Sequence, residues 1–304
     1  KAGCDIEAKV DDHTLLISQS GCNHPEWMKI LIENGANVNA RDKHGFTPFL
    51  RAAYHGHPEY FSQLIAAGCS KTATDDEGYN ALMLAACRGS SKCIRPLLDI
   101  GGFSMSQVNK YNQNAVLNAI ISDDAETVKA LLNGLKAKGI HYDINAKTAF
   151  ENETPLTFAA RTGKVNCINA MLSLRWTWNL NLETRNGKNF TPLWAAWLGQ
   201  NKDAFVALRK AGCNIDARRD GWTMLANAAA IEPSGWVKIL LENGADKGLR
   251  VHGELPYEIA DRTGNSADRA VIYYHGTHGS GLPWSPWHQR DEDLLSVSSG
   301  SDAE

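Results

Sequence analysis

The sequence predicts an all-α solenoid in which pairs of short antiparallel helices are joined by hairpin loops. Three observations predict it. A start segment, usually opened by Thr or Asn, recurs about every 33 residues, an apolar pair follows most starts by about 17 residues, and a glycine follows most starts by about 21 residues. Recurrence at a fixed period of roughly 20 to 50 residues is typical of stacked structural repeats.

The start segments predict the first helix of each unit. The clearest copies are Thr47-Pro48-Phe49, Thr154-Pro155-Leu156 and Thr191-Pro192-Leu193, and weaker copies begin at Thr14, Asn80, Asn114, Thr223 and Leu255. Successive starts are separated by 33, 33, 34, 40, 37, 32 and 32 residues. Thr is a favourable helix N-cap and Pro is favourable at the first helical position, so each start marks a helix N-terminus.

A second helix is predicted about eleven residues after each start. His24-Pro25-Glu26 and His57-Pro58-Glu59 show this second start, with an acidic residue in the first turn. The second helix then carries the apolar pair and ends at a glycine such as Gly35 or Gly68, which suits a left-handed C-cap. Helices of about two to three turns are marginal alone, so they must bury their apolar faces against neighbouring units.

These units resemble the ankyrin repeat family. The best matches are Asn34-Gly35-Ala36-Asn37-Val38-Asn39-Ala40, Gly45-Phe46-Thr47-Pro48-Phe49 and Glu242-Asn243-Gly244-Ala245-Asp246. We expect residues 1–9 to be the end of a truncated repeat, residues 10–276 to be an ankyrin repeat array, and residues 277–304 to be a largely disordered tail. About eight repeats are expected, with starts near residues 10, 42, 75, 109, 149, 186, 218 and 250. The resemblance implies stacked L-shaped units whose concave face and hairpin tips bind protein partners.

The sequence departs from the family at one position of the repeat. Family members usually carry His three residues after the Thr start, where its side chain ties neighbouring loops together. This chain instead has Ile17, Leu50, Met83, Leu117, Thr157, Trp194, Ala226 and Glu258. We expect these side chains to pack in the core, and we expect the loops to be tied less rigidly.

The composition argues against nucleic-acid and membrane partners. The 304 residues have a formal net charge of −3, and Lys and Arg are spread along the chain, so the basic patch typical of nucleic-acid or anionic-membrane binding is absent. No apolar run approaches the roughly 18 residues that span a bilayer, so we expect no membrane insertion. The seven cysteines include no C-x-x-C pair, which favours buried thiols in a reducing compartment, the cytoplasm or the nucleus.

The sequence contains no motif typical of catalysis or cofactor binding. A nucleophile elbow, an H-E-x-x-H motif and a phosphate-binding loop are absent, and the ten histidines do not cluster with cysteine at metal-ligand spacing. We therefore expect a protein that is not an enzyme and that holds no cofactor and no metal.

The resemblance also implies which residues contact a partner, because the family uses the position before each start and the C-terminal end of the first helix. Tyr, Trp and Arg are the residue types that most often contribute binding energy. The predicted partner-binding residues are Phe46, Tyr54, His55, Tyr79, Arg88, Tyr111, Phe190 and Trp222. The alternative is that these side chains only shield the neighbouring hairpin.

Two longer spacings place insertions in the middle of the array. The first insertion lies in residues 133–141, and the second contains Arg175-Trp176-Thr177-Trp178. One interpretation is simple loop growth. The alternative is a protruding recognition element built on Trp176 and Trp178, since exposed apolar patches often mark interaction sites.

The leading functional hypothesis is a protein-interaction module, a scaffold or adaptor, that acts as a monomeric array on a protein partner of unknown identity. The alternative is the substrate-targeting or regulatory arm of a larger multidomain enzyme or channel. Because the chain opens within the repeat pattern at Lys1, we expect further sequence upstream. A catalytic or membrane domain there would favour the alternative.

Overall fold

The computed structural model describes residues 5–148, 151–231 and 235–275. The chain divides into two compact units, residues 1–214 and residues 215–304, and each unit is described by itself. Both units consist mainly of short paired helices. The predicted tail, from residue 277 onward, lies outside the described residues.

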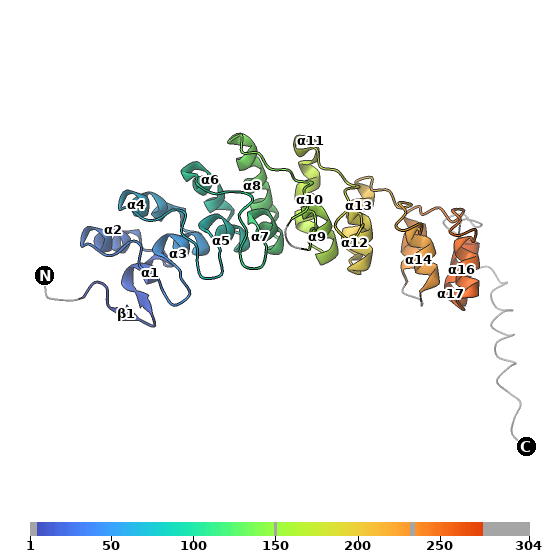
Figure 1. Ribbon diagram of the computed structural model, residues 1–304, viewed down its shortest axis with the longest axis horizontal. Coiled ribbons are helices and arrows are strands. Elements are labelled where there is room, and N and C mark those ends of the chain that lie inside the picture. Colours follow the sequence, from blue (N-terminus) through green and yellow to red (C-terminus); the bar gives the residue numbers. More distant parts are fainter. Residues whose placement is uncertain (1–4, 149–150, 232–234, 276–304) are drawn as a thin grey trace, which may run out of the picture. The chain divides into compact units, whose positions relative to one another are not determined.

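In unit 1 each repeat contributes a first and a second helix. The first helices are α1 (Leu15–Ser20), α3 (Pro48–His55), α5 (Ala81–Cys87), α7 (Ala115–Ile121), α9 (Pro155–Thr162) and α12 (Pro192–Leu198). The second helices are α2 (Pro25–Glu33), α4 (Phe61–Ala66), α6 (Ser91–Ile100), α8 (Ala125–Ala137), α10 (Val165–Ser173) and α13 (Lys202–Lys210). The first helices form one row and the second helices another (Figure 1), which confirms the predicted helical solenoid. A short hairpin of β1 (Lys9–Val10) and β2 (His13–Thr14) precedes α1.

The predicted starts of the first helices are confirmed. The side chain of each start residue accepts a hydrogen bond from the backbone N–H three residues later at Thr14, Thr47, Asn80, Asn114, Thr154, Thr191 and Thr223. Asn therefore replaces Thr as the cap in two units. Leu255 has no acceptor side chain, and there the Glu258 carboxylate accepts the Leu255 N–H at 2.7 Å.

The second helices show one local departure from the prediction. The helix α2 begins at Pro25 as expected, but Pro58 opens a 3₁₀ turn, η1 (Pro58–Tyr60), before α4 begins. The buried Tyr60 side chain at the end of this turn reaches the preceding repeat. Its hydroxyl donates to the Cys22 carbonyl at 2.5 Å and accepts from the His24 N–H at 2.8 Å.

The core lies between successive helix pairs. The residues that replace the family's His are fully buried in unit 1, at Ile17, Leu50, Met83, Leu117, Thr157 and Trp194. The position thirteen residues after each start is also fully buried, at Tyr60, Cys93, Thr127, Cys167 and Ala204. In the first described repeat the same position, Trp27, is 51% exposed. Burial at this position therefore comes from stacking on the preceding repeat, not from the fold of one repeat alone.

Successive hairpins in unit 1 are tied together by the backbone. N–H groups of one hairpin donate to carbonyl groups of the preceding hairpin, at 2.9 to 3.0 Å, in the pairs Asp76–His44, Lys110–Glu77 and Gly187–Asn152. These bonds tie the loops without the side chain that the family usually employs.

The described residues of unit 2, 215–231 and 235–275, form two helix pairs. They are α14 (Met224–Ala230) with α15 (Trp236–Glu242), and α16 (Pro256–Arg262) with α17 (Ser266–Tyr274). The Asn265 amide ties the pairs together, because its Nδ2 donates to the Ile231 carbonyl at 2.8 Å. In unit 1 the Asn201 amide plays the same role, since its Nδ2 donates to the Arg161 carbonyl at 2.6 Å.

Neither insertion is simple loop growth. Residues 133–137 lengthen α8, and Leu135 in this extension is fully buried, so continued helix gains apolar burial that a loop would lose. Gly134 permits close packing here, because a Cβ at this position would lie 2.5 Å from Leu98 Cδ1. The second insertion forms a one-turn helix, α11 (Arg175–Trp178).

Candidate interaction surface

A recurring hydrogen-bonded loop fixes the residue before each first helix. Asp42 Oδ1 accepts the N–H groups of the residues two and four positions later, and the second of these is Phe46, at 2.9 Å. Asp75 Oδ1 accepts in the same way and holds the Tyr79 N–H at 2.8 Å. Asx side chains commonly stabilise turns in this manner. Equivalent bonds are made by Asn109 and Asn186. These acceptors are not among the predicted site residues, although their recurrence at positions 42, 75, 109 and 186 is visible in the sequence.

In three repeats the residue before the start contacts the residue eight positions later, at the C-terminal end of the first helix. In the second repeat the pair is aromatic, and the Phe46 and Tyr54 ring centroids lie 5.6 Å apart, edge to face. In later repeats the pair becomes ionic, with N–O distances of 2.8 and 3.0 Å in Glu153–Arg161 and Glu254–Arg262. One pair of repeat positions therefore sets the local chemistry of this face.

Two arginines extend the aromatic pair. Arg51 Cζ lies 5.6 Å from the Phe46 ring centroid, and Arg88 Cζ lies 4.8 Å from the Tyr54 ring centroid. His13 lies beside the first of them: its Nδ1 is 2.7 Å from the Asp11 carbonyl oxygen, and its Nε2 is 2.5 Å from Arg51 Nη2 and 3.3 Å from Asp42 Oδ2. Arginine and aromatic side chains thus alternate across two repeats.

Tyr79 and Tyr111 form a second ring pair, in the third and fourth repeats. The Tyr79 ring centroid lies 6.4 Å from that of Tyr111, which is 52% exposed. The Tyr79 hydroxyl donates to Gln113 Oε1 at 3.5 Å. Burial raises the pKa of the Tyr79 hydroxyl and of the neighbouring Cys87 thiol, so both groups stay protonated and uncharged at neutral pH. Cys87 lies near Tyr79 and directly precedes Arg88 in the chain.

His55 lies beside Tyr54, with ring centroids 5.1 Å apart. Burial, followed by the positive charges of Arg51, His57 and Arg88, lowers the pKa of His55 below 6.5. His55 is therefore neutral at neutral pH, and the positive charge of this face comes from its arginines.

Six of the eight predicted partner-binding residues thus come together in unit 1, and the structure adds Arg51 to them. We name this set the aromatic–arginine surface; its members are Phe46, Arg51, Tyr54, His55, Tyr79, Arg88 and Tyr111.

Phe190 and Trp222 lie apart from this set. Phe190 is only 8% exposed and packs beside Trp194, with ring centroids 6.5 Å apart, so it offers little side-chain surface to a partner. Trp222 belongs to unit 2, where its ring lies 5.6 Å from that of His252. We leave both out of the aromatic–arginine surface.

The two tryptophans of the second insertion have different surroundings. Trp176 is 83% exposed, and Arg175 Cζ lies 4.2 Å from its ring centroid. Trp178 is half-buried and meets the Tyr142 ring edge to face, with centroids 6.4 Å apart. Only Trp176 projects its side chain into solvent, so the predicted pair does not form one exposed element.

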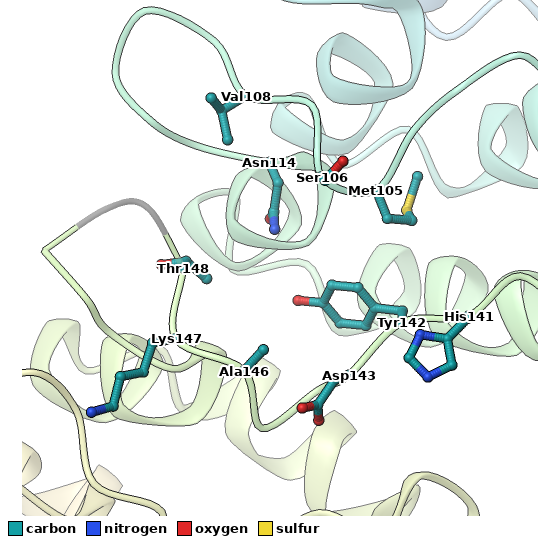
Figure 2. Close-up of a pocket in the computed structure, with 10 residues that line it drawn as sticks. All are labelled: Met105, Ser106, Val108, Asn114, His141, Tyr142, Asp143, Ala146, Lys147 and Thr148. Carbon is teal, nitrogen blue, oxygen red and sulfur yellow. The ribbon is translucent and has the colours of Figure 1, made fainter.

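An open groove of about 360 Å³ lies near the first insertion. Figure 2 shows the Tyr142 ring between the segment that carries Met105 and the segment that carries Ala146. Burial raises the pKa of the Tyr142 hydroxyl, and a hydrogen bond with the Asn114 side chain opposes this shift. The Tyr142 hydroxyl thus remains protonated. The sequence analysis assigned no role to this residue.

Within residues 5–148, 151–231 and 235–275, no group of three or more His, Cys, Asp or Glu side chains is placed to hold a metal ion. In the same part of the chain, no helix is both long and apolar enough to cross a bilayer.

Comparison with known proteins agrees with the repeat architecture. The family model described as ankyrin repeats in three copies matches residues 2–75 and 50–139. No match was found among curated proteins.

Two solved ankyrin repeat domains resemble the whole architecture. The human ASB11 ankyrin repeat domain is 22% identical with a TM-score of 0.57, and the match covers 79% of this chain and all of that domain. The ankyrin repeat domain of Bcl-3, a member of the IkappaB protein family, is 20% identical with a TM-score of 0.54, covering 83% of this chain and 95% of that one. At sequence identities this low, the two comparisons show only that the folds are alike. With the register of capped helix pairs, they show that the chain has the ankyrin repeat fold, and residues 2–139 match the ankyrin repeat family model.

Proposed function

We propose that this protein is a protein-interaction module, a scaffold or adaptor, that binds a protein partner through the aromatic–arginine surface. One observation carries the proposal: Arg51, Phe46, Tyr54 and Arg88 form a series of ring and guanidinium contacts, and the Tyr79–Tyr111 ring pair lies in the third and fourth repeats beside it in sequence. Ankyrin repeats are in general protein-interaction modules and are typically non-enzymatic.

The burial of these side chains supports a binding role over pure packing. Phe46, Tyr54 and Tyr79 are half-buried, while Arg88 and Tyr111 are exposed. Each of these side chains therefore keeps some surface that a partner could cover. Rings held against their neighbours lose little conformational entropy when a partner covers them. Tyr and Arg in such positions often dominate binding energy.

The test begins with a partner identified by pull-down and mass spectrometry and then purified. We expect Tyr54→Ala combined with Tyr79→Ala to weaken its binding by about tenfold or more, because each change removes a held aromatic contact. Tyr273→Ala is the matched control, since Tyr273 is a 55% exposed tyrosine of unit 2. Circular dichroism and the urea midpoint establish that each variant is folded. Unchanged binding by the folded double variant contradicts the proposal.

We also propose that the protein works in a reducing compartment, the cytoplasm or the nucleus. Among the described residues, the cysteines Cys22, Cys69, Cys87, Cys93, Cys167 and Cys213 are all free. Burial raises the pKa of the Cys93, Cys167 and Cys213 thiols to about 12, so these act as small apolar core groups and not as reactive thiolates.

A further inference from the structure

The aromatic–arginine surface carries positive charge that the described residues do not neutralise. Neither Arg51 nor Arg88 lies within ion-pair distance of a described carboxylate. Arg51 Nη2 lies 2.5 Å from His13 Nε2, and Arg88 lies over the Tyr54 ring. Three other arginines of unit 1, Arg41, Arg95 and Arg161, are paired with acids, and Arg41 lies 3.1 Å from Asp76.

The acids near this surface already have partners. The Asp42 and Asp75 carboxylates accept backbone N–H groups of their own hairpins. Glu77 at the hairpin tip lies 3.9 Å from Lys110 Nζ. The second Asp42 oxygen, Oδ2, lies 3.3 Å from His13 Nε2. None of these carboxylates forms an ion pair with Arg51 or Arg88, so neither guanidinium group has an acidic partner among the described residues.

The two guanidinium groups are also well placed to take an anionic group. Each lies by an aromatic ring, and a guanidinium that rests on a ring keeps the N–H groups of its edge available. Such an edge binds carboxylates by charge-assisted hydrogen bonds. Between the arginines lie Phe46 and Tyr54, and beyond Arg88 lie Tyr79 and Tyr111, so apolar contact area alternates with the cations.

From this charge complementarity we propose that the partner segment is an acidic peptide, with carboxylates that meet Arg51 and Arg88 and apolar side chains that meet the rings. The inference rests on the proposed function and names the chemistry of its partner. In an extended segment every second side chain faces the surface, so acidic and apolar residues placed at positions i, i+2 and i+4 would meet the arginines and the rings.

The probe is a random twelve-residue peptide library displayed against the full chain, followed by affinity measurements on the selected peptides. We expect the selected peptides to be enriched in Asp and Glu. We expect Arg51→Gln with Arg88→Gln to weaken their binding by about tenfold or more, because hydrogen bonds to charged groups are the stronger ones. Raised salt should weaken the same binding. Arg95→Gln is the matched control, because Arg95 in α6 is exposed and already paired with Asp99 at 3.3 Å.

Each outcome separates the two proposals. If the selected peptides lose binding with Tyr54→Ala and Tyr79→Ala but are not enriched in Asp and Glu, the acidic-peptide proposal is wrong and the proposed surface is still supported. The same conclusion follows if Arg51→Gln with Arg88→Gln leaves the binding of the peptides unchanged in a folded variant. If neither the tyrosine changes nor the arginine changes weaken peptide binding, the peptides bind elsewhere, and this result counts against the proposed function as well. A selection that yields no binder to the wild-type chain also counts against both.

Discussion

At the scale of single residues, the surface owes its charge state to burial and to neighbouring cations. His55 is the clearest case, because desolvation is the largest cause of its lowered pKa and Arg51, His57 and Arg88 act in the same direction. The unfolded chain therefore binds a proton at His55 more readily than the folded chain does. Stability from this residue is complete above the unfolded pKa of about 6.5 and falls as the pH drops below it.

The first prediction concerns this titration. The His55 imidazole should titrate below pH 6.5 in an NMR experiment, with its signals assigned from a His55→Gln spectrum. Arg88→Gln should raise the His55 pKa only part of the way to 6.5, because burial and Arg51 remain. A His55 pKa at or above 6.5 in the wild-type chain would show that the ring is not held beside these cations.

At the scale of the helix, each repeat depends on a single capping residue. Thr47 Oγ1 accepts the Leu50 N–H at 3.3 Å, and Asn80 Oδ1 accepts the Met83 N–H at 2.9 Å in the equivalent position. Either side chain supplies the acceptor that the first turn of a helix lacks. The weak copies in the sequence are therefore structurally equal to the strong ones.

The second prediction follows from this equivalence. Thr47→Ala should lower the free energy of unfolding by about 1 kcal/mol, because α3 loses its cap. Thr47→Asn should stay within about 0.5 kcal/mol of the wild type, because Asn and Thr are both good caps. Urea unfolding followed by circular dichroism measures both. Equal losses from the two variants would mean that the cap contributes nothing beyond the shape of Thr.

At the scale of the whole chain, stability depends on contacts between repeats. The short helices bury their apolar faces only when stacked, as the exposed Trp27 and its fully buried counterparts show. Polar ties add to this packing. The Asn201 amide holds the Arg161 carbonyl, and Gly199 lets the two backbones approach, because a Cβ there would lie 2.1 Å from the same carbonyl oxygen.

The third prediction tests this contact. Gly199→Ala should lower the free energy of unfolding by about 2 kcal/mol, because the added methyl group pushes α12 away from α9. Lys202→Ala, a change at an exposed residue three positions later, should have an effect within about 0.5 kcal/mol. Urea midpoints compare the two. A Gly199→Ala chain as stable as the wild type would refute the close approach.

Local patterns along the chain were enough to predict the helical solenoid, the starts of the first helices and six residues that come together in the aromatic–arginine surface. These features repeat, and each depends on local chemistry such as Thr47 capping its own helix. The sequence did not reveal that Asn133–Ala137 would continue α8, because that outcome depends on burial of Leu135 against other helices.

Which of the predicted residues lie beside one another follows from how the repeats pack, and no pattern along the chain reveals it. Arg51 joins the surface because its side chain reaches Phe46 and His13, a contact between positions that no repeat pattern marks. Phe190 occupies the same repeat position as Phe46 but is buried. The physical reason is that burial and ion pairing depend on which side chains the neighbouring repeats supply, while a periodic pattern reports only what each repeat has in common.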